Sequence, residues 1–302
     1  MKNPFRSGYV AILGRPNAGK STLLNALLGE KLVIVTPKPQ TTRQRIRGIL
    51  TTKSSQIVFI DTPGYHEGGN LLNEALLSEA LAALSDAEVV LYLLDATRKI
   101  AKEDRELLGK IAGRGLPAIA VISKVDLVGK PQILPLLEEL SKILPWVALI
   151  PVSATKNDGL AVLLSEIEKL LPEGPALFPE DQISDSNERF RAAEIIREKL
   201  FQKLRQELPY SIAVEILSFE EKPAINRISA RILVDRDSQK AIVIGKGGEN
   251  LKAAGTAARQ ELEELWGKKV FLELTVECEK DWTKDPQALR RLGYAAPSGK
   301  KG

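Results

Sequence analysis

The chain of 302 residues is poor in the side chains that make disulfides, metal sites and membrane spans. It has one cysteine, Cys278, and one histidine, and aromatic residues make up 5% of it. A single cysteine excludes an intramolecular disulfide framework and a zinc site built from cysteines. No apolar run approaches the roughly 18 residues needed to cross a bilayer, and residues 1–8 have no signal-peptide core. We therefore expect a cytoplasmic protein.

The chain also lacks a strong charge of either sign. Lys and Arg number 43 against 39 Asp and Glu, a net charge of +4. Residues 1–180 carry 21 basic and 19 acidic side chains, and residues 181–302 carry 22 and 20. Any nucleic-acid site must therefore be a local patch rather than a basic domain.

The first half alternates short apolar runs with helical patterns. The runs expected to be strands are 9–13, 45–51, 56–60, 88–94, 117–122 and 146–151. Leu and Ala recur at helical spacing in 20–29, 70–84, 102–113, 131–143 and 159–171. This alternation predicts an α/β fold with a mostly parallel sheet and helices on both faces. Because only four residues separate the second and third runs, we expect them to form a hairpin with one antiparallel edge strand.

The second half has a different pattern. Residues 172–187 contain three prolines and no periodic apolar face, which is typical of a linker. An amphipathic helix at 188–206 is then followed by elements that give the order α-β-β-α-α-β. We therefore expect a first domain at 1–171 and a smaller α+β domain at 188–302, in which the last twenty residues are a tail.

A phosphate-loop motif, G-x-x-x-x-G-K-[ST], lies between an expected strand and an expected helix, which is the context it requires. Glycine lets backbone N–H groups approach phosphate oxygens, and the helix N-terminus adds a positive dipole end. We expect Lys20 to reach the β- and γ-phosphates and the Ser21 hydroxyl to ligate Mg²⁺. The nucleotide-binding residues expected here are Gly14, Arg15, Pro16, Asn17, Ala18, Gly19, Lys20, Ser21 and Thr22.

A second segment, Asp61-Thr62-Pro63-Gly64, ends the run 56–60. A carboxylate there can hold Mg²⁺ through a water, and the Gly64 N–H can meet the γ-phosphate. Taken alone, the segment is equally an ordinary Asp-Pro-Gly turn. Its place after the phosphate loop favours the nucleotide reading.

Two later segments follow expected parallel strands, at the sheet edge where open α/β sheets bind ligands. They consist of Ser123, Lys124, Val125 and Asp126, and of Ser153, Ala154 and Thr155. The Asp126 carboxylate can accept from both N1–H and the N2 amino group of guanine, which adenine does not offer. The Lys124 stem can lie across the base, and the Ala154 N–H can donate to O6. Together these residues predict guanine specificity.

The four segments resemble the translation-factor class of P-loop GTPases, and GRPNAGKS with PQTTR and DTPG is similar to its TrmE–Era branch. Residues 188–200, 238–252 and 269–274 resemble the C-terminal domain of the Era family, bacterial GTPases of small-ribosomal-subunit assembly. The resemblance covers residues 6 to about 295 and implies a type II KH domain in the second half.

One residue departs from the family pattern. The family usually has Asn-Lys-x-Asp where this chain begins with Ser123. The resemblance implies that the Asn bonds the purine N7 and braces the loop. We expect its replacement to affect nucleotide affinity more than base preference, which rests mainly on Asp126.

The residue after Gly64 is Tyr65, where many GTPases carry the glutamine that orients the attacking water. The resemblance implies a hydrophobic residue at this position, and we expect slow intrinsic hydrolysis. We interpret His66 as a loop residue rather than a base, because GTPases catalyse mainly by positioning and charge stabilisation. The expected catalytic residues are Lys20, Thr42, Gly64 and Asn17.

Switch I is expected at 33–47, with Thr42 as an Mg²⁺ ligand beside Ser21 and Asp61; Thr41 is the alternative ligand. The resemblance implies that Asn17 can ligate K⁺, and the alternative is that Asn17 only tolerates an awkward backbone angle. Residues 36–53 have no acid and fit either an RNA contact or a solvated strand edge. Their basic side chains are Lys38, Arg43, Arg45, Arg47 and Lys53.

A G-x-x-G loop follows the expected helix at 238–243. Its glycines let the backbone approach a nucleic-acid backbone closely. Tyr294, in a basic tail, fits an RNA-contacting extension. The RNA-binding residues expected in this half are Arg227, Arg231, Lys240, Gly245, Lys246, Gly247, Gly248 and Lys252.

We therefore expect a monomeric GTPase that uses GTP, GDP and Mg²⁺, with K⁺ as a further candidate cofactor. Its KH domain would bind the 3′ end of small-subunit ribosomal RNA on the 30S subunit during assembly. One alternative is a passive RNA-binding scaffold with a structural nucleotide. The other is a growth or cell-cycle regulator that associates peripherally with the inner membrane.

Overall fold

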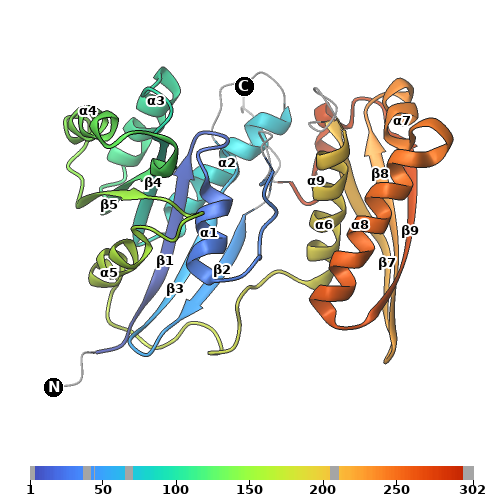
Figure 1. Cartoon of the computed structure of the whole chain (residues 1–302), viewed down its shortest axis with the longest axis horizontal. Helices are drawn as coiled ribbons and strands as arrows, with labels where there is room; N and C mark the ends of the chain where they lie inside the picture. Colours follow the sequence, from blue (N-terminus) through green and yellow to red (C-terminus); the bar gives the residue numbers. More distant parts are fainter. Residues whose placement is uncertain (1–3, 37–41, 44, 65–70, 205–210, 295–302) are drawn as a thin grey trace. The chain divides into compact units, whose positions relative to one another are not determined.

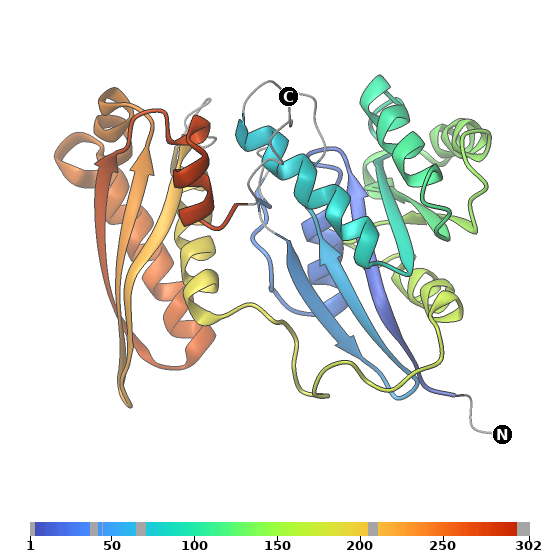
Figure 2. The ribbon, with the colours of Figure 1, turned by 180° about the vertical axis from the view of Figure 1, so that it is seen from behind.

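The computed structural model describes residues 4–36, 42–43, 45–64, 71–204 and 211–294 (Figures 1 and 2). The chain divides into two compact units, Met1–Gly69 with Asn73–Asp185, and Asn70–Leu72 with Ser186–Gly302. Each unit has its own sheet and its own apolar core.

The first unit is built on a six-stranded sheet with the order β2-β3-β1-β4-β5-β6. Its strands are β1 Arg6–Gly14, β2 Ile46–Thr51, β3 Ser55–Asp61, β4 Val89–Asp95, β5 Ala118–Ser123 and β6 Ala148–Val152. All neighbours pair in parallel except β2 and β3, which form the expected antiparallel hairpin. Every residue of β4 is buried, because helices cover both faces of the sheet.

Helices lie on both faces of this sheet (Figures 1 and 2). They are α1 Lys20–Leu28, α2 Leu71–Asp86, α3 Lys102–Ala112, α4 Lys130–Ser141 and α5 Leu160–Leu170. Apolar residues of α2, α3 and α4 pack with Tyr92 and its neighbours on one face. Helices α1 and α5 lie on the other face and touch each other. The expected doubly covered α/β architecture is confirmed.

The segment expected to be a linker is attached to the first unit along much of its length. The buried Gln56 side chain accepts hydrogen bonds from the Leu177 and Phe178 N–H groups (2.6 and 2.8 Å) and donates to the Phe178 carbonyl (2.9 Å). The Ile49 N–H donates to the Ile183 carbonyl at 2.9 Å. Proline and the lack of periodicity therefore mark an irregular segment, and Gln56 holds it on the sheet.

The second unit has the order α6-β7-β8-α7-α8-β9, as expected. Its main elements are α6 Glu188–Lys203, β7 Ala213–Glu221, β8 Ile225–Val234, α7 Asp237–Ile244, α8 Glu249–Trp266 and β9 Lys269–Cys278. Strand β8 pairs antiparallel with β7 and parallel with β9. Apolar residues of α6, α7 and α8 share one core with Ile228, Ala230 and Ile232 of β8. The three helices therefore cover one face of the sheet, which is the type II KH arrangement.

The C-terminal part is more ordered than the expected tail. A short turn of 3₁₀ helix, Trp282–Lys284, leads into helix α9, Pro286–Arg291, in which Ala288 and Leu289 are buried. Tyr294 is 8% exposed and stacks on Trp282 with 6.2 Å between ring centroids. The Tyr294 ring is therefore packed against Trp282, which leaves it little surface for the RNA contact that was expected.

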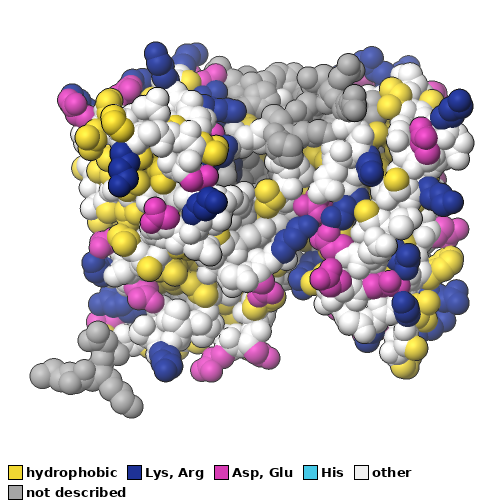
Figure 3. Space-filling view, viewed as in Figure 1, with side chains coloured by type: hydrophobic (Ala, Val, Ile, Leu, Met, Phe, Trp, Pro, Cys, Tyr) yellow, Lys and Arg dark blue, Asp and Glu magenta, His cyan; other side chains and the backbone are white. Residues whose placement is uncertain are grey.

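No helix among the described residues is long and apolar enough to cross a membrane. On the face seen in Figure 3, basic and acidic side chains are interspersed over each unit. This agrees with the nearly balanced charge of both halves and shows no basic domain on that face.

Candidate nucleotide site and RNA-binding loop

The phosphate loop joins β1 to α1, and its backbone explains its glycines. Gly14 has φ +150°, and a Cβ there would lie 2.5 Å from the Leu93 carbonyl oxygen. Gly19 caps α1 in the left-handed region with φ +95°. Asn17 has φ 62°, a conformation that Asn tolerates better than most residues. The loop therefore turns sharply and leaves the N-terminus of α1 open to an anion.

Lys20 lies inside this loop and is 6% exposed. Its ammonium donates to the Gly14 and Arg15 carbonyls, both at 3.1 Å. Burial lowers the pKa of Lys20 to about 8, although the nearby Asp61 carboxylate opposes the shift. The site thus holds a cation that two carbonyls only partly compensate, which favours a negatively charged ligand.

A fully buried carboxylate, Asp61, ends β3 beside Lys20. Its Oδ2 accepts hydrogen bonds from Ser21 Oγ (3.0 Å) and Thr42 Oγ1 (2.8 Å), and these two hydroxyls lie 2.9 Å apart. Burial raises the pKa of Asp61, which Lys20 and the two hydroxyls oppose. The other oxygen, Oδ1, is buried without a hydrogen-bond partner. Three oxygen side chains with one unsatisfied carboxylate oxygen fit Mg²⁺, which prefers oxygen ligands.

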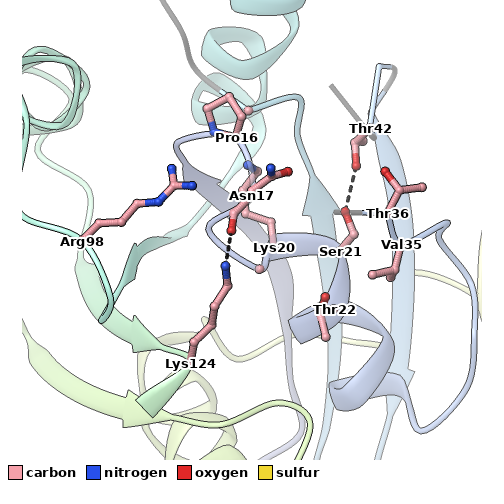
Figure 4. A pocket seen from close by; sticks show the side chains of 12 residues that line it. Pro16, Asn17, Lys20, Ser21, Thr22, Val35, Thr36, Thr42, Arg98 and Lys124 are labelled. Atoms are coloured by element: carbon pink, nitrogen blue, oxygen red, sulfur yellow. Dashed lines mark hydrogen bonds between the residues drawn. The ribbon is translucent and has the colours of Figure 1, made fainter. Parts of the chain in front are cut away.

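A cavity of about 430 Å³ opens over the phosphate loop (Figure 4). Its lining residues are Pro16, Asn17, Gly19, Lys20, Ser21, Thr22, Val35, Thr36, Thr42, Gly64, Arg98 and Lys124. Gly64 packs so closely on the loop that a Cβ would lie 2.7 Å from the Pro16 Cα. Only glycine therefore allows the 61–64 segment to approach the phosphate loop at this point. In the same segment, the Thr62 hydroxyl donates to the Ile12 carbonyl at 2.7 Å, which ties the end of β3 to β1.

The loop after β5 is tied to the phosphate loop by two side chains. The Ser123 hydroxyl lies 2.6 Å from the Ala18 carbonyl oxygen and 3.2 Å from that of Leu94. The Lys124 ammonium donates to the Asn17 carbonyl (2.6 Å) and to the Asp95 carboxylate (2.7 Å). Ser123 therefore reaches the phosphate loop and braces it.

Asp126 lies one turn further along and is exposed. The Ser153 hydroxyl, at the end of β6, donates to Asp126 Oδ1 at 2.6 Å and lies 3.3 Å from Thr155 Oγ1. Ala154 sits between these two residues. The structure thus joins the two base segments, and the remaining lone pairs of Asp126 can accept from a ligand.

Three polar residues at this edge have no signal in the sequence motifs. Asp95 ends β4 and holds the Lys124 ammonium. Arg98, three residues later, points toward Asn17 in Figure 4, with its Nε 3.8 Å from Asp95 Oδ2. The fully buried Asp104 lies 3.6 Å from the Arg15 guanidinium, and Arg15 is not among the residues that line the cavity. In the sequence, only the position of Asp95 at the end of an expected strand could have indicated a role at this edge.

The described basic residues of 36–53 differ in their surroundings. Arg45 pairs with Glu79 (2.7 Å) and Asp86 (2.9 Å), and Arg47 pairs with Asp185 (2.8 Å). Arg43 is buried, and Lys53 is exposed. Arg45 and Arg47 are therefore paired with acids of the first unit, and the expected RNA contact of this segment stays a prediction. Lys38, Thr41, Tyr65 and His66 lie outside the described residues.

The G-x-x-G loop joins α7 to α8. Gly245, Gly247 and Gly248 have φ of 77°, 59° and 81°, which side chains rarely adopt. A Cβ on Gly245 would lie 2.8 Å from Asn250 Nδ2, whereas nothing lies within 4 Å of one on Gly247 or Gly248. The outer side of the loop is therefore open. The loop leads directly into the N-terminus of the 18-residue helix α8.

Basic side chains flank this loop. Lys246 and Lys252 are exposed, and Lys240 is partly exposed on α7. Ile242, 52% exposed, adds an apolar contact that the sequence analysis did not single out. This set can meet a phosphate backbone with its charges and a base with Ile242.

Arg227 and Arg231 lie elsewhere. They alternate with buried β8 residues that face the helices, so they project from the opposite face of the sheet. The Arg227 guanidinium lies 5.5 Å from the Phe271 ring centroid. Arg231 is held by Glu215 (2.7 Å) and Glu277 (2.9 Å), which raise its pKa further. As expected, strand alternation therefore places both on the outward face of β8, away from the helices that carry the glycine loop.

The first unit combines a phosphate loop, a buried Ser-Thr-Asp cluster and a guanine-type loop, and the second has the KH topology. These features define a P-loop GTPase joined to a KH domain. Family models agree: residues 9–124 match the family described as 50S ribosome-binding GTPase, and residues 207–283 match the KH domain.

Full-length relatives identify the family. The chain is 49% identical to GTPase Era of Geobacter metallireducens, covering 97% of this chain and 99% of the relative. It is 46% identical to GTPase Era of Syntrophus aciditrophicus, covering 96% and 95%. The chain belongs to the GTPase Era family, as its sequence motifs indicated.

Solved structures agree with this assignment. Era in complex with MgGDPNP and nucleotides 1506–1542 of 16S ribosomal RNA has a TM-score of 0.94 and 43% identity, covering 96% of this chain and 99% of that one. Aquifex aeolicus Era bound to GDP and AlF₄⁻ has a TM-score of 0.93 and 43% identity, covering 96% and 100%.

Proposed function

We propose that this protein is a GTP-hydrolysing switch whose KH domain binds the 3′ end of small-subunit ribosomal RNA and acts in 30S assembly. The observation that carries the proposal is the presence in one chain of two open anion-binding loops, each made by glycines and each at a helix N-terminus. One loop belongs to the GTPase unit and the other to the KH unit. A switch needs both loops, because the nucleotide state has an effect only if it changes the affinity for a second ligand.

In the nucleotide site, Lys20 would neutralise the β- and γ-phosphates, since its partly compensated ammonium already lies under the loop. Ser21, Thr42 and Asp61 would hold Mg²⁺, which supplies charge neutralisation to the phosphates when bound. Asp61 Oδ1 has no hydrogen-bond partner among the described residues, which supports its use by this ion or its water.

Hydrolysis would depend on positioning. The Gly64 backbone lies against Pro16, close enough to the phosphate loop for its N–H to meet the γ-phosphate. Thr42 would ligate Mg²⁺ on the side of the site where the γ-phosphate lies. Asn17 would ligate a monovalent cation with its side-chain oxygen. These roles account for charge stabilisation without a general base.

Guanine recognition would rest on Asp126, oriented by Ser153. Asp126→Asn replaces an acceptor with a donor opposite the N2 amino group of guanine. We expect GTP binding to fall by roughly 10⁴, because polar groups are left unpaired, and xanthosine triphosphate binding to improve. Competition binding with GTP, ATP and xanthosine triphosphate measures both. Equal competition by ATP and GTP in the unaltered protein would show that the base assignment is wrong.

The RNA partner is proposed from the relatives. The Era structure with 16S RNA nucleotides covers nearly the whole of this chain, whereas the family described by the 50S ribosome matches only residues 9–124. The full-length likeness therefore favours the small subunit. Filter binding with a single-stranded oligomer of 16S 3′-end sequence tests this, with Lys246→Asp/Gly247→Asp as the variant expected to lose binding. Arg227→Ala is the matched control, because that side chain lies across the sheet from the loop.

The domain division 1–171, 172–187 and 188–302, the monomeric state and the cytoplasmic location are part of the same proposal. A passive scaffold is the rival, and it requires equal RNA affinity with GTP, with GDP and without nucleotide. A peripheral membrane regulator is the second rival. Vesicle flotation tests it, and cosedimentation with anionic vesicles would favour it.

A further inference from the structure

Ser123 occupies the position where the family resemblance leads one to expect asparagine, and its hydroxyl is already committed. It lies 2.6 Å from the Ala18 carbonyl oxygen and 3.2 Å from the Leu94 carbonyl oxygen. Both neighbours are acceptors only, so the hydroxyl must be the donor in each contact. The side chain is 6% exposed, and its short stem leaves the oxygen against the phosphate loop.

A serine hydroxyl has one hydrogen, whereas an asparagine amide has two. Guanine N7 is an acceptor, so recognising it requires a second donor. Once the Ser123 proton is shared by Ala18 and Leu94, only oxygen lone pairs remain for N7. The Lys124 ammonium uses two of its three N–H groups on the Asn17 carbonyl and the Asp95 carboxylate, which holds it at the phosphate loop while its stem is the part expected against the base.

We infer that this protein recognises guanine without using N7: Ser123 keeps the loop-bracing hydrogen bond and leaves N7 unread. The inference rests on the proposed guanine site and deepens it, since Asp126 and Ala154 read the N1, N2 and O6 edge. The ligand class accepted here therefore includes 7-deazaguanine nucleotides as well as guanine nucleotides.

The test is competition binding of GDP, 7-deaza-GDP, inosine diphosphate and ADP to the full-length protein. We expect GDP and 7-deaza-GDP to bind within about twofold of each other, since one neutral hydrogen bond would give about fivefold. Inosine diphosphate, which lacks the N2 amino group, should bind more weakly, and ADP weaker still. Discrimination against 7-deaza-GDP of about fivefold or more by the unaltered protein would overturn the inference.

Two variants sharpen the result. Ser123→Asn adds the second donor, and we expect it to prefer GDP over 7-deaza-GDP by about fivefold. Ser123→Ala removes the brace, so both nucleotides should weaken equally and their ratio should stay near one. An altered ratio in Ser123→Ala would mean that the hydroxyl does touch the base. If GDP does not outcompete ADP, the guanine site itself is wrong, which is a separate outcome from failure of the N7 inference.

Discussion

Lys20 is an expected phosphate-binding residue whose side chain has little contact with water. Its ammonium is buried, and within the described part of the chain two backbone carbonyls at 3.1 Å accept from it. Burial brings the pKa down to about 8, so the free site begins to lose its proton just above neutral pH. Phosphate oxygens would restore the missing partners and favour the charged form.

We therefore predict proton uptake on GDP binding. Because the phosphates bind the protonated lysine, affinity is at full strength below pH 8 and falls as the pH rises above it. Isothermal titration between about pH 7 and about 8.5, in buffers of different ionisation enthalpy and without Mg²⁺, measures the uptake. It should be near zero at the lower pH and approach half a proton or more at the higher pH. Uptake that does not change with pH would contradict this assignment.

Asn17 offers a prediction that separates a backbone role from a side-chain role. Its φ of 62° is tolerated by Asn and is natural for Gly. If the side-chain oxygen ligates K⁺, that ion stands in for an arginine finger, whose contribution is about 10³–10⁵. We expect hydrolysis at least about tenfold faster in K⁺ than in Na⁺. Asn17→Gly should abolish the difference while keeping the backbone angle, and single-turnover rates in both salts measure it. A K⁺ effect that survives in Asn17→Gly would leave only the backbone role.

At the scale of elements, Gln56 joins a strand to a segment more than 120 residues later. It is fully buried in β3, and its amide makes three hydrogen bonds to the backbone of residues 177 and 178. This side chain thus adds to the backbone hydrogen bonds, such as Ile49 N–H to the Ile183 carbonyl, that attach the proline-containing segment to the first unit.

We predict that Gln56→Leu lowers the free energy of unfolding by about 1–3 kcal/mol, because two N–H groups and one carbonyl lose their partner. Hydrogen exchange at Leu177 and Phe178 should accelerate more than at β4. Gln56→Glu is the matched control, since its carboxylate can still accept from both N–H groups. Denaturant unfolding and hydrogen exchange provide the two measurements, and unchanged exchange at 177 and 178 would argue against the anchor.

At the scale of the whole molecule, each unit has its own core. A change in the exposed glycine loop should therefore leave the GTPase unit folded, and any effect on turnover must come through RNA. Linkage requires that if RNA binds the GTP state more tightly, GTP tightens RNA binding by the same factor.

We predict that RNA accelerates GTP turnover and that a GTP analogue increases RNA affinity over GDP by roughly 5- to 150-fold, the usual range of such coupling. Lys246→Asp/Gly247→Asp should lose both effects and keep the RNA-free rate. Filter binding in three nucleotide states and single-turnover hydrolysis with and without RNA measure them. Identical RNA affinity in all states, with no RNA effect on hydrolysis, would favour the passive scaffold.

Much of the fold and the nucleotide site was predictable because the signals are local. The apolar runs, the helical spacing and the glycines at positive φ act over a few neighbouring residues. They predicted the six strands, the hairpin and the α-β-β-α-α-β order, whereas the nucleotide-binding motifs indicated that Ser21, Thr42 and Asp61 act together. The motif order along parallel strands then brought the base segments to one edge of the sheet.

Only the tertiary structure decided which side chains meet across long separations. Arg45 and Arg47 are neutralised by acids far along the chain, and Arg231 is held between Glu215 and Glu277. The Ser123 hydroxyl is directed to the carbonyl of Ala18, which lies 105 residues away in sequence. Charge and hydrogen bonding depend on distances of a few ångströms, and those distances are set by packing rather than by the neighbours of a residue in the chain.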